Sequence, residues 1–386
     1  MQNYIVVYEI FTGKKLRCVY LSRIAVFGLE VKAQISVYGK ISEKNLHILN
    51  FGKEVNMQKT KKSLKIFAAF IISFSFIITA KAADKLVPLG HTTGIKLLCD
   101  GAIVTELSDN VPENPCRAAG IAPGDVIKSV DGNAVTSNDD LRRMVTESEG
   151  REMTVEYVRQ GEVKAVKVTP VKAEDGKYAL GIRIRDSVAG IGTLTYYNPE
   201  NKTYGALGHG VTESDTNVLI PPQRGALMKS KVESVVQGGP GNPGELRGEY
   251  DLTNDYADIE KNTESGIFGK IKDSAEFEKM AQYPIANKNE IKRGKATILS
   301  NVEGDEVKEY EIEITSIYFD GEKTKNMLVR ATDPELIAKT GGIVRGMSGS
   351  PIIQDGKIVG AITHVLVNNP QKGYAIFIEN MLDAAA

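Results

Sequence analysis

Histidine and cysteine are scarce in this sequence, and neither sign of charge is in excess. Histidine-dependent chemistry has only four candidates: His47, His91, His209 and His364. The three cysteines lack the C-x-x-C spacing of a zinc site or a thioredoxin-like site: Cys18, Cys99 and Cys116. Forty-eight basic residues against 49 acidic ones leave no basic excess for binding nucleic acid. We therefore expect no metal, no other cofactor and no nucleic-acid partner.

Long apolar runs are also missing from residues 1–56, which show no sustained helical period and no segment able to cross a bilayer. We assign them no role. We expect translation to start at Met57, which makes residues 1–56 an upstream extension of the gene model. The chain as a whole has 42% hydrophobic and 25% charged residues, an ordinary globular composition, and its 386 residues allow two or three domains.

Residues 57–83 have the three parts of a secretory signal. Met57–Lys65 is cationic, Ile66–Ala80 is apolar, and Ala80-Lys81-Ala82 has the small-any-small pattern that signal peptidase prefers. We expect either a cleaved signal peptide or an uncleaved membrane anchor, because the apolar block is shorter than the roughly 20 residues of a spanning helix. Everything after residue 83 is then extracytoplasmic, where the two following cysteines either form a disulfide or remain free thiols.

Residues 88–172 have the pattern of a small α+β domain. Strands are expected at 94–98 and 102–107, separated by a turn at Asp100-Gly101. A helix capped by Ser137 follows, with an apolar stripe on one face. The last element is a hairpin of two alternating strands, 153–159 and 163–169.

Residues 119–132 carry the pattern AGI-x-x-GD-x-I-x-x-V-x-G, which resembles the core of a PDZ domain. PDZ domains bind an extended peptide by adding it as a strand to a sheet edge. The resemblance places the peptide-binding amides at Thr93, Gly94 and Ile95. The alternative is a small α+β domain without a ligand.

Residues 177–386 read as short strands separated by Gly, Asn, Asp and Pro turns, which is typical of an all-β barrel or sandwich. A hairpin, 191–197 and 202–207, leads into Gly208-His209-Gly210. Glycines on both sides leave the imidazole uncrowded, as a general base requires. His364 is the rival base, but it lies in an alternating strand, where a packing role is expected, and His91 is closer to the signal segment.

The run Gly346-Met347-Ser348-Gly349-Ser350-Pro351 resembles the nucleophile loop of chymotrypsin-like serine peptidases. Small residues there let the amides of Gly346 and Ser348 point at one spot, where the oxyanion of a tetrahedral intermediate would lie. A hairpin, 351–354 and 357–365, follows the serine as in that fold. We therefore expect a mainly β protein: a signal or membrane segment, a PDZ-like domain, and a chymotrypsin-like double β-barrel peptidase domain.

Three blocks resemble the signature of the SpoIVB peptidase family, the stage IV sporulation protein B of endospore-forming bacteria: Gly208-His209-Gly210, residues 332–336 and residues 339–351. The resemblance implies that Ser348 is the nucleophile, His209 the base and Asp333 the acid that orients the imidazole. Asp333 before Pro334 fits a helix N-cap equally well. In the chymotrypsin template the acid instead follows the histidine, where other candidates lie: Asp215, Asp251, Asp255 and Asp258.

The family resemblance also implies a biological role. Members cut themselves near the start of the PDZ region, here about residues 87–94, although Leu89 and His91 depart from the usual run. They then cleave a regulatory membrane protein in the space between forespore and mother cell, and so trigger activation of a late sigma factor. The alternatives are a catalytically silent PDZ scaffold and a general quality-control serine protease of the cell envelope.

Overall fold

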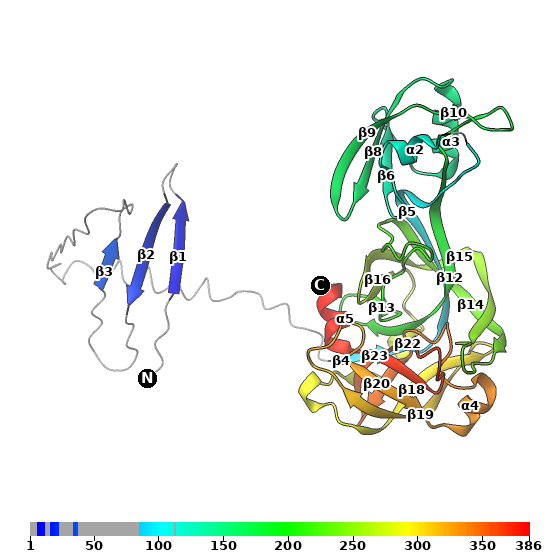
Figure 1. Cartoon of the computed structure of the whole chain (residues 1–386). Coiled ribbons are helices and arrows are strands. Elements are labelled where there is room, and N and C mark those ends of the chain that lie inside the picture. The colour runs from blue at the N-terminus through cyan, green and yellow to red at the C-terminus, as the bar shows by residue number, and fades with distance from the viewer. Residues whose placement is uncertain (1–5, 12–15, 23–33, 38–84, 112) are drawn as a thin grey trace. The chain divides into compact units, whose positions relative to one another are not determined.

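The computed structural model describes residues 6–11, 16–22, 34–37, 85–111 and 113–386 (Figure 1). The chain divides into two units, residues 1–79 and residues 80–386. The first contains an antiparallel sheet of three strands in the order β1 (Val6–Phe11), β2 (Leu16–Ser22) and β3 (Gln34–Val37). The signal segment expected at 57–83 lies outside the described residues. Among the residues that are described, no helix has the length and apolar character needed to cross a membrane.

The second unit contains a first barrel, which we call barrel 1. Six strands pair in a ring that the pairing of β12 with β5 closes. In order around the ring they are β12 (Ile182–Asn198), β13 (Thr203–Ala206), β16 (Gly266–Ile271), β15 (Glu245–Thr263), β14 (Pro222–Val236) and β5 (Thr92–Leu107). Two short strands continue the sheet beyond β12: β4 (Lys85–Pro88) and β17 (Tyr283–Pro284). Large apolar side chains fill the interior, among them Leu97, Leu194, Tyr204 and Leu227.

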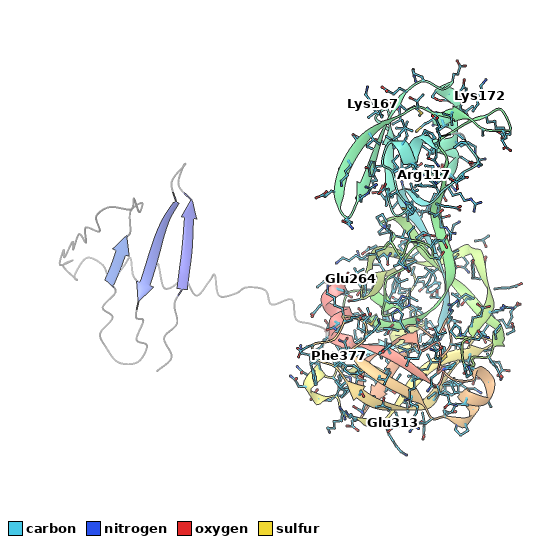
Figure 2. All side chains as sticks on the ribbon, viewed as in Figure 1. Arg117, Lys167, Lys172, Glu264, Glu313 and Phe377 are labelled. Atoms are coloured by element: carbon cyan, nitrogen blue, oxygen red, sulfur yellow. The ribbon has the colours of Figure 1, made fainter. Side chains whose placement is uncertain are left out.

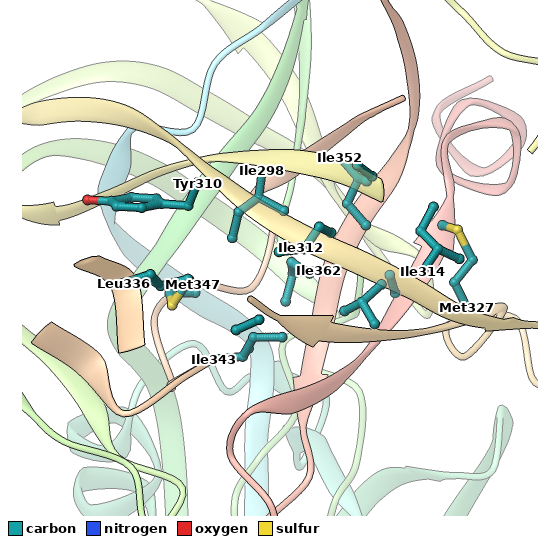
Figure 3. Close-up of a cluster of buried hydrophobic side chains, with 14 of the residues drawn as sticks. Ile298, Tyr310, Ile312, Ile314, Met327, Leu336, Ile343, Met347, Ile352 and Ile362 are labelled. Atoms are coloured by element: carbon teal, nitrogen blue, oxygen red, sulfur yellow. The ribbon is translucent and has the colours of Figure 1, made fainter. Parts of the chain in front are cut away.

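Barrel 2 is a second closed ring of six strands. Their order is β18 (Gly294–Glu303), β19 (Glu306–Ile317), β20 (Met327–Ala331), β23 (Lys372–Phe377), β22 (Lys357–Val365) and β21 (Pro351–Gln354). Figure 3 shows its aliphatic core, which includes Ile298, Ile312, Ile314 and Ile362. The helical segments that follow β16 in the chain are short: η1 (Phe277–Lys279), η2 (Lys288–Glu290), α4 (Pro334–Thr340) and α5 (Ile378–Ala385). Through Ile378 and Met381, α5 joins a cluster with side chains of both barrels.

The PDZ module lies between the two long strands β5 and β12 in the sequence. Its elements are α2 (Pro115–Ala118), β6 (Val126–Val130), β7 (Asn133–Ala134), α3 (Asn138–Glu147), β8 (Met153–Arg159), β9 (Glu162–Val168), β10 (Val171–Lys172) and β11 (Tyr178–Ala179). Ser137 caps α3 by accepting a hydrogen bond from the Asp140 amide at 3.1 Å, and Leu141 and Val145 are buried. The predicted helix and hairpin are therefore confirmed.

β5 and β12 run side by side from the PDZ module into barrel 1 (Figure 1). Sequence reasoning divided β5 into two strands at Asp100-Gly101, but the structure has one strand of 16 residues. Gly101 keeps the strand continuous with a φ of 112°, and a Cβ atom there would lie 2.4 Å from the Ile127 carbonyl oxygen. The predicted domain boundary at residue 88 therefore falls within the sheet of barrel 1, because β4 and the first half of β5 pair with strands of that barrel.

Cys99 and Cys116 are free thiols buried in separate cores, that of barrel 1 and that of the PDZ module. Burial raises the pKa of each thiol to about 12. Of the two alternatives left open by the sequence, the structure shows the free thiols. The mainly β architecture, with a PDZ module and two six-stranded barrels, confirms the expected fold class.

Candidate active site

His209 follows the hairpin formed by β12 and β13. The chain turns sharply after this hairpin, because Leu207 and Gly208 both have positive φ values, 69° and 70°. A Cβ atom at Gly208 would lie 2.9 Å from Ile376 Cγ2 and 3.0 Å from Thr363 Cγ2. Glycine thus lets barrel 1 approach barrel 2 at this point, and the turn places the imidazole at the junction of the two barrels.

Ser348 lies in the loop between α4 and β21, and both barrels hold this loop. The buried Thr193 of β12 donates twice, from its amide to the Ser348 carbonyl at 2.9 Å and from its hydroxyl to the Gly346 carbonyl at 2.7 Å. The Ile362 carbonyl of β22 accepts from the Gly349 amide at 2.7 Å. Gly349 has a φ of 101°, and a Cβ atom there would lie 2.0 Å from the Thr193 carbonyl oxygen. Only glycine fits this position.

Two amides of the loop are available for a substrate. Met347, Gly349 and Ser350 each donate their amide hydrogen to a backbone carbonyl, whereas Gly346 and Ser348 make no such bond to any described residue. These are the two amides expected to form the oxyanion hole. Their free donors would stabilise negative charge on the carbonyl oxygen of a tetrahedral intermediate.

The side chains of Ser348 and His209 line the same cavity, which has a volume of about 880 Å³. Glu264, labelled in Figure 2, lies on the wall of this cavity. The Ser348 hydroxyl donates to the Thr363 carbonyl at 2.6 Å, and within the described residues no hydrogen bond joins it to His209. The hydroxyl must therefore turn toward the imidazole before it can lose its proton, a rearrangement that is common when substrate is absent.

His209 is held by its own neighbour along the chain. Its Nδ1 lies 2.9 Å from the Gly210 carbonyl oxygen, so a hydrogen on Nδ1 would leave the lone pair of Nε2 for the serine hydroxyl. Burial lowers the pKa of His209 below its ordinary value of 6.5, and the hydrogen bond to Gly210 opposes this shift. The imidazole is therefore neutral at neutral pH, as a general base must be.

His364 contacts the candidate base, although the alternation of its strand predicted a packing role. It is exposed at the end of β22, with its ring centroid 4.9 Å from that of His209 and the two ring planes inclined at 36°. Partial desolvation lowers the pKa of His364, and the charges of His209 and Lys325 act in the same direction. Sequence reasoning missed this neighbour because alternation along a strand does not show where the strand ends. His91 lies elsewhere, beside Phe277.

Asp333 is the N-cap of α4. Its carboxylate accepts hydrogen bonds from the amides of Glu335 at 2.8 Å and Leu336 at 3.0 Å, and from the Glu311 amide at 3.3 Å. No hydrogen bond or ion pair links it to His209 in the part of the chain that the structure describes. The helix-cap alternative is thus what the structure shows, and the contact implied by the family resemblance is not formed.

Three of the other four acid candidates have carboxylates engaged away from His209. The Asp251 carboxylate accepts hydrogen bonds from Thr253. For Asp215 the structure shows only a bond of the backbone amide, to Glu213. Asp255 and Asp258 form ion pairs with Lys272. None of these four carboxylates is joined to the imidazole by a contact among the described residues.

Thr93, Gly94 and Ile95 lie in the middle of barrel 1. On one side they pair with β12 and on the other with β14. Because both edges are occupied, a peptide strand cannot add there, and the predicted location of the PDZ peptide site is corrected. In the PDZ module, a cavity of about 1330 Å³ lies instead between α3 and the first residues of β12.

Two protein-family models match the chain. The SpoIVB peptidase S55 model matches residues 176–382, more than half of the chain, and the PDZ domain model matches residues 82–169. Among curated proteins, a putative zinc metalloprotease of Clostridium perfringens is 28% identical over 185 residues, which are 46% of this chain and 54% of that protein. A putative zinc metalloprotease of Rhizobium meliloti is 32% identical over 107 residues, 27% of this chain and 28% of that protein. The chain thus spans about half or less of the length of these relatives.

Solved structures to which the chain is similar include the Rv3671c protease of M. tuberculosis in its inactive and active forms. The inactive form has a TM-score of 0.31 at 11% identity and covers 50% of this chain and 82% of that one. The active form has a TM-score of 0.29 at 15% identity, and the match covers 52% of this chain and 75% of that one. The PDZ domain of an SdrC-like protein of Listeria monocytogenes has a TM-score of 0.20 at 23% identity, and the match covers 22% of this chain and 87% of that one.

The match over more than half of the chain agrees with the glycine-bounded histidine and the serine loop that the two barrels bring to one cavity. The chain belongs to the SpoIVB peptidase S55 family and contains a PDZ domain.

Proposed function

We propose that the protein is a serine endopeptidase that acts outside the cytoplasm in the signalling that accompanies endospore formation. It would be directed there by residues 57–83, process itself, and cleave a regulatory membrane protein whose loss leads to activation of a late sigma factor. Family membership supports this role. The observation that carries the peptidase chemistry is the meeting of Ser348 and His209, from opposite barrels, in one cavity beside two unpaired amides.

In the proposed mechanism, Ser348 attacks the scissile carbonyl. Its hydroxyl turns from the Thr363 carbonyl toward Nε2 of His209, which takes the proton and later returns it to the leaving amine. The amides of Gly346 and Ser348 hold the oxyanion during both steps. Water then replaces the leaving peptide and hydrolyses the acyl-enzyme by the same proton transfers in reverse.

We propose that the Gly210 carbonyl orients the imidazole. It is the hydrogen-bond partner of Nδ1, at 2.9 Å, and it fixes the tautomer that leaves Nε2 free. Asp333, by contrast, has its carboxylate engaged by three backbone amides. Its role would then be to fix the start of α4, the helix that precedes the serine loop.

Self-processing is proposed to occur before Lys85. Residues 86, 87 and 89 are at most 2% exposed, and Leu86 and Val87 pair with Tyr283 and Tyr197. A peptidase needs its substrate as an accessible extended segment, and a strand paired inside a folded sheet cannot provide one. Cleavage within 87–94 would thus require β4 to detach first.

For the PDZ module we propose a peptide site on the edge of β12 that faces α3. Residues 182–185 pair only with β5, and their side chains line the large cavity together with Leu141 and Val145 of α3. An extended peptide would add to this edge as a strand and place alternate side chains against the helix.

A fluorophosphonate probe tests the catalytic proposal, because it reacts with an activated serine. We expect the wild-type protein to be labelled and Ser348→Ala to remain unlabelled. An unlabelled wild type, or equal labelling of the variant, would support the silent PDZ scaffold. Sequencing the mature amino terminus of both proteins tests self-processing, which should stop in Ser348→Ala.

The quality-control alternative makes a different prediction about substrates. A general envelope protease degrades many unfolded proteins, whereas a signalling peptidase leaves most of them intact. Incubation of the wild type with unfolded casein, followed by electrophoresis, separates the two. Extensive degradation would contradict the signalling role and leave the serine chemistry unaffected.

A further inference from the structure

A small cavity lies beside the candidate nucleophile, in addition to the larger one described above. Its volume is about 280 Å³, and both Ser348 and His209 line it. The larger cavity has charged groups on its walls, including Glu264, Glu322 and Lys323. No carboxylate and no lysine lines the small one. The two sides of the serine thus offer a substrate different chemistry.

Apolar side chains dominate the small cavity. Those of Ile343, Val344 and Ile362 are at most 2% exposed and belong to the core of barrel 2, so they form fixed walls. The full apolar lining is Pro243, Ile343, Val344, Ile362, Val365 and Val367. The lining also includes Arg345, which is exposed. A basic substrate side chain would lose water in this cavity without gaining a partner, and an acidic one would meet only a solvated guanidinium. An aliphatic side chain would be buried favourably.

The strand next to the cavity can also align a substrate. β22 pairs with β21 only as far as Ala361, and the Thr363 carbonyl beyond that point accepts the Ser348 hydroxyl. A peptide laid along residues 363–365 would extend the sheet and bring its scissile bond to Ser348. The side chain before that bond would then lie in the small cavity.

The shape of the walls favours aliphatic over aromatic side chains. Five of the six apolar lining residues are β-branched and therefore stiff at χ1: Ile343, Val344, Ile362, Val365 and Val367. Val344 is 2% exposed and belongs to the core of barrel 2. The walls cannot rearrange into a flat slot for an aromatic ring without disturbing the core of barrel 2.

We propose that this cavity is the specificity pocket and that the enzyme cleaves after aliphatic residues such as valine and leucine. The proposal rests on the proposed role of Ser348. It adds the class of residue that the peptidase selects. Because one misplaced or missing methylene in an apolar pocket changes specificity by roughly 10-fold or more, the preference over charged residues should be at least that large.

Peptidyl diphenyl phosphonates test the pocket, since they react with the active-site serine at rates set by the side chain they carry. Five probes would differ only in that side chain: Val, Leu, Phe, Lys and Glu. We expect the Val and Leu probes to label the enzyme at least about 10-fold faster than the Lys and Glu probes, and faster than Phe. Fastest labelling by Phe, Lys or Glu would overturn the proposal.

A charge placed at the rim sharpens the test. Val367 is 48% exposed, so Val367→Asp should fold normally and raise the labelling rate of the Lys probe relative to Val. The matched control is Val163→Asp, a valine 73% exposed on the β8–β9 hairpin, which should leave the ratio unchanged. An unchanged ratio in both variants would place the substrate side chain outside this cavity.

The fluorophosphonate probe carries no such side chain and reports on Ser348 alone. If it fails to label the wild type, the catalytic proposal fails. If it labels the wild type and both variants while the phosphonates show the wrong preference, only the pocket proposal fails.

Discussion

The serine and the histidine of the candidate active site are held in different ways. The Ser348 loop is bonded to both barrels, with Thr193 on one side and Ile362 on the other. His209 has one hydrogen bond, to the backbone of the next residue, and no carboxylate partner among the described residues. The serine side is built by long-range contacts that fix a backbone, and the histidine side by a local turn. Variants of the serine loop should therefore change stability and kcat, whereas variants beside the histidine should change the pH dependence.

The largest effect is expected from removing the nucleophile. Ser348→Ala should lower kcat for peptide cleavage by on the order of 10⁶-fold, because the remaining groups cannot form the acyl-enzyme. The Ser348 side chain makes only one hydrogen bond, to Thr363, so thermal unfolding should change little. A variant that keeps more than a tenth of the activity would show that another group is the nucleophile.

Thr193→Val tests how far barrel 1 controls the serine loop. The variant leaves the Gly346 carbonyl without its hydroxyl donor in a buried site, which should cost about 1–3 kcal/mol of stability. It should also lower kcat by about 10-fold or more, since the Gly346 and Ser348 amides lose their anchor.

The control for this variant is Thr195→Val. Thr195 is also 0% exposed on β12, but its hydroxyl has no hydrogen-bond partner in the structure. Urea unfolding and steady-state kinetics should show little change, because no bond is lost. Equal effects of the two substitutions would mean that the Thr193 hydroxyl does not anchor the loop.

Asp333 distinguishes a helix cap from an orienting acid. Asp333→Ala should cost about 1 kcal/mol of stability through loss of the cap, whereas Asp333→Asn should keep most of that stability, because asparagine also caps helices. Activity should follow stability in both variants. A folded Asp333→Asn protein with a 100-fold lower kcat would instead support a role beside His209.

The smallest expected effect is on pH dependence. Catalysis needs neutral His209, whose pKa burial holds below 6.5, so kcat/KM should stay constant at neutral pH and decline only as pH falls through that lowered pKa. His364→Ala should let water reach the His209 imidazole. This raises the pKa of His209 and moves the acid limb of the kcat/KM profile to higher pH. His364→Phe keeps a ring in place and should leave it near the wild-type position. A limb at the same pH in all three proteins would show that His364 does not shield His209.

The serine loop and the histidine turn could be predicted from sequence because both depend on glycine. Gly208 and Gly349 occupy positions where a side chain would collide with neighbouring atoms. A requirement for glycine of this kind can be recognised in a short sequence motif. The hairpins on either side were predictable for the same reason, since their turns are local. The PDZ module and the two barrels were expected from the resemblance of two motifs to known families, because the strand spacing alone left a barrel and a sandwich open.

Pairing between strands that are far apart in the sequence could not be recognised from a local motif. Sequence reasoning placed Thr93–Ile95 at an open edge, because nothing local shows that β14 covers one side of β5. It also missed Thr193, which is one polar residue among several in β12, and His364, whose neighbour lies 155 residues earlier in the chain. These contacts depend on how the barrels close and on where they meet.

The paired strands β5 and β12 have a consequence for protein engineering. The PDZ module lies between Leu98 and Ser187, which face each other across the pair, and so forms an insertion into a hairpin of barrel 1, although Cys99 still packs in the core of that barrel. A two-residue turn such as Asn-Gly could join these positions and close the hairpin directly. Foreign binding domains could be spliced in at the same place if their two ends lie one strand spacing apart, roughly 5 Å. The protein could thus accept other binding domains in place of its PDZ module.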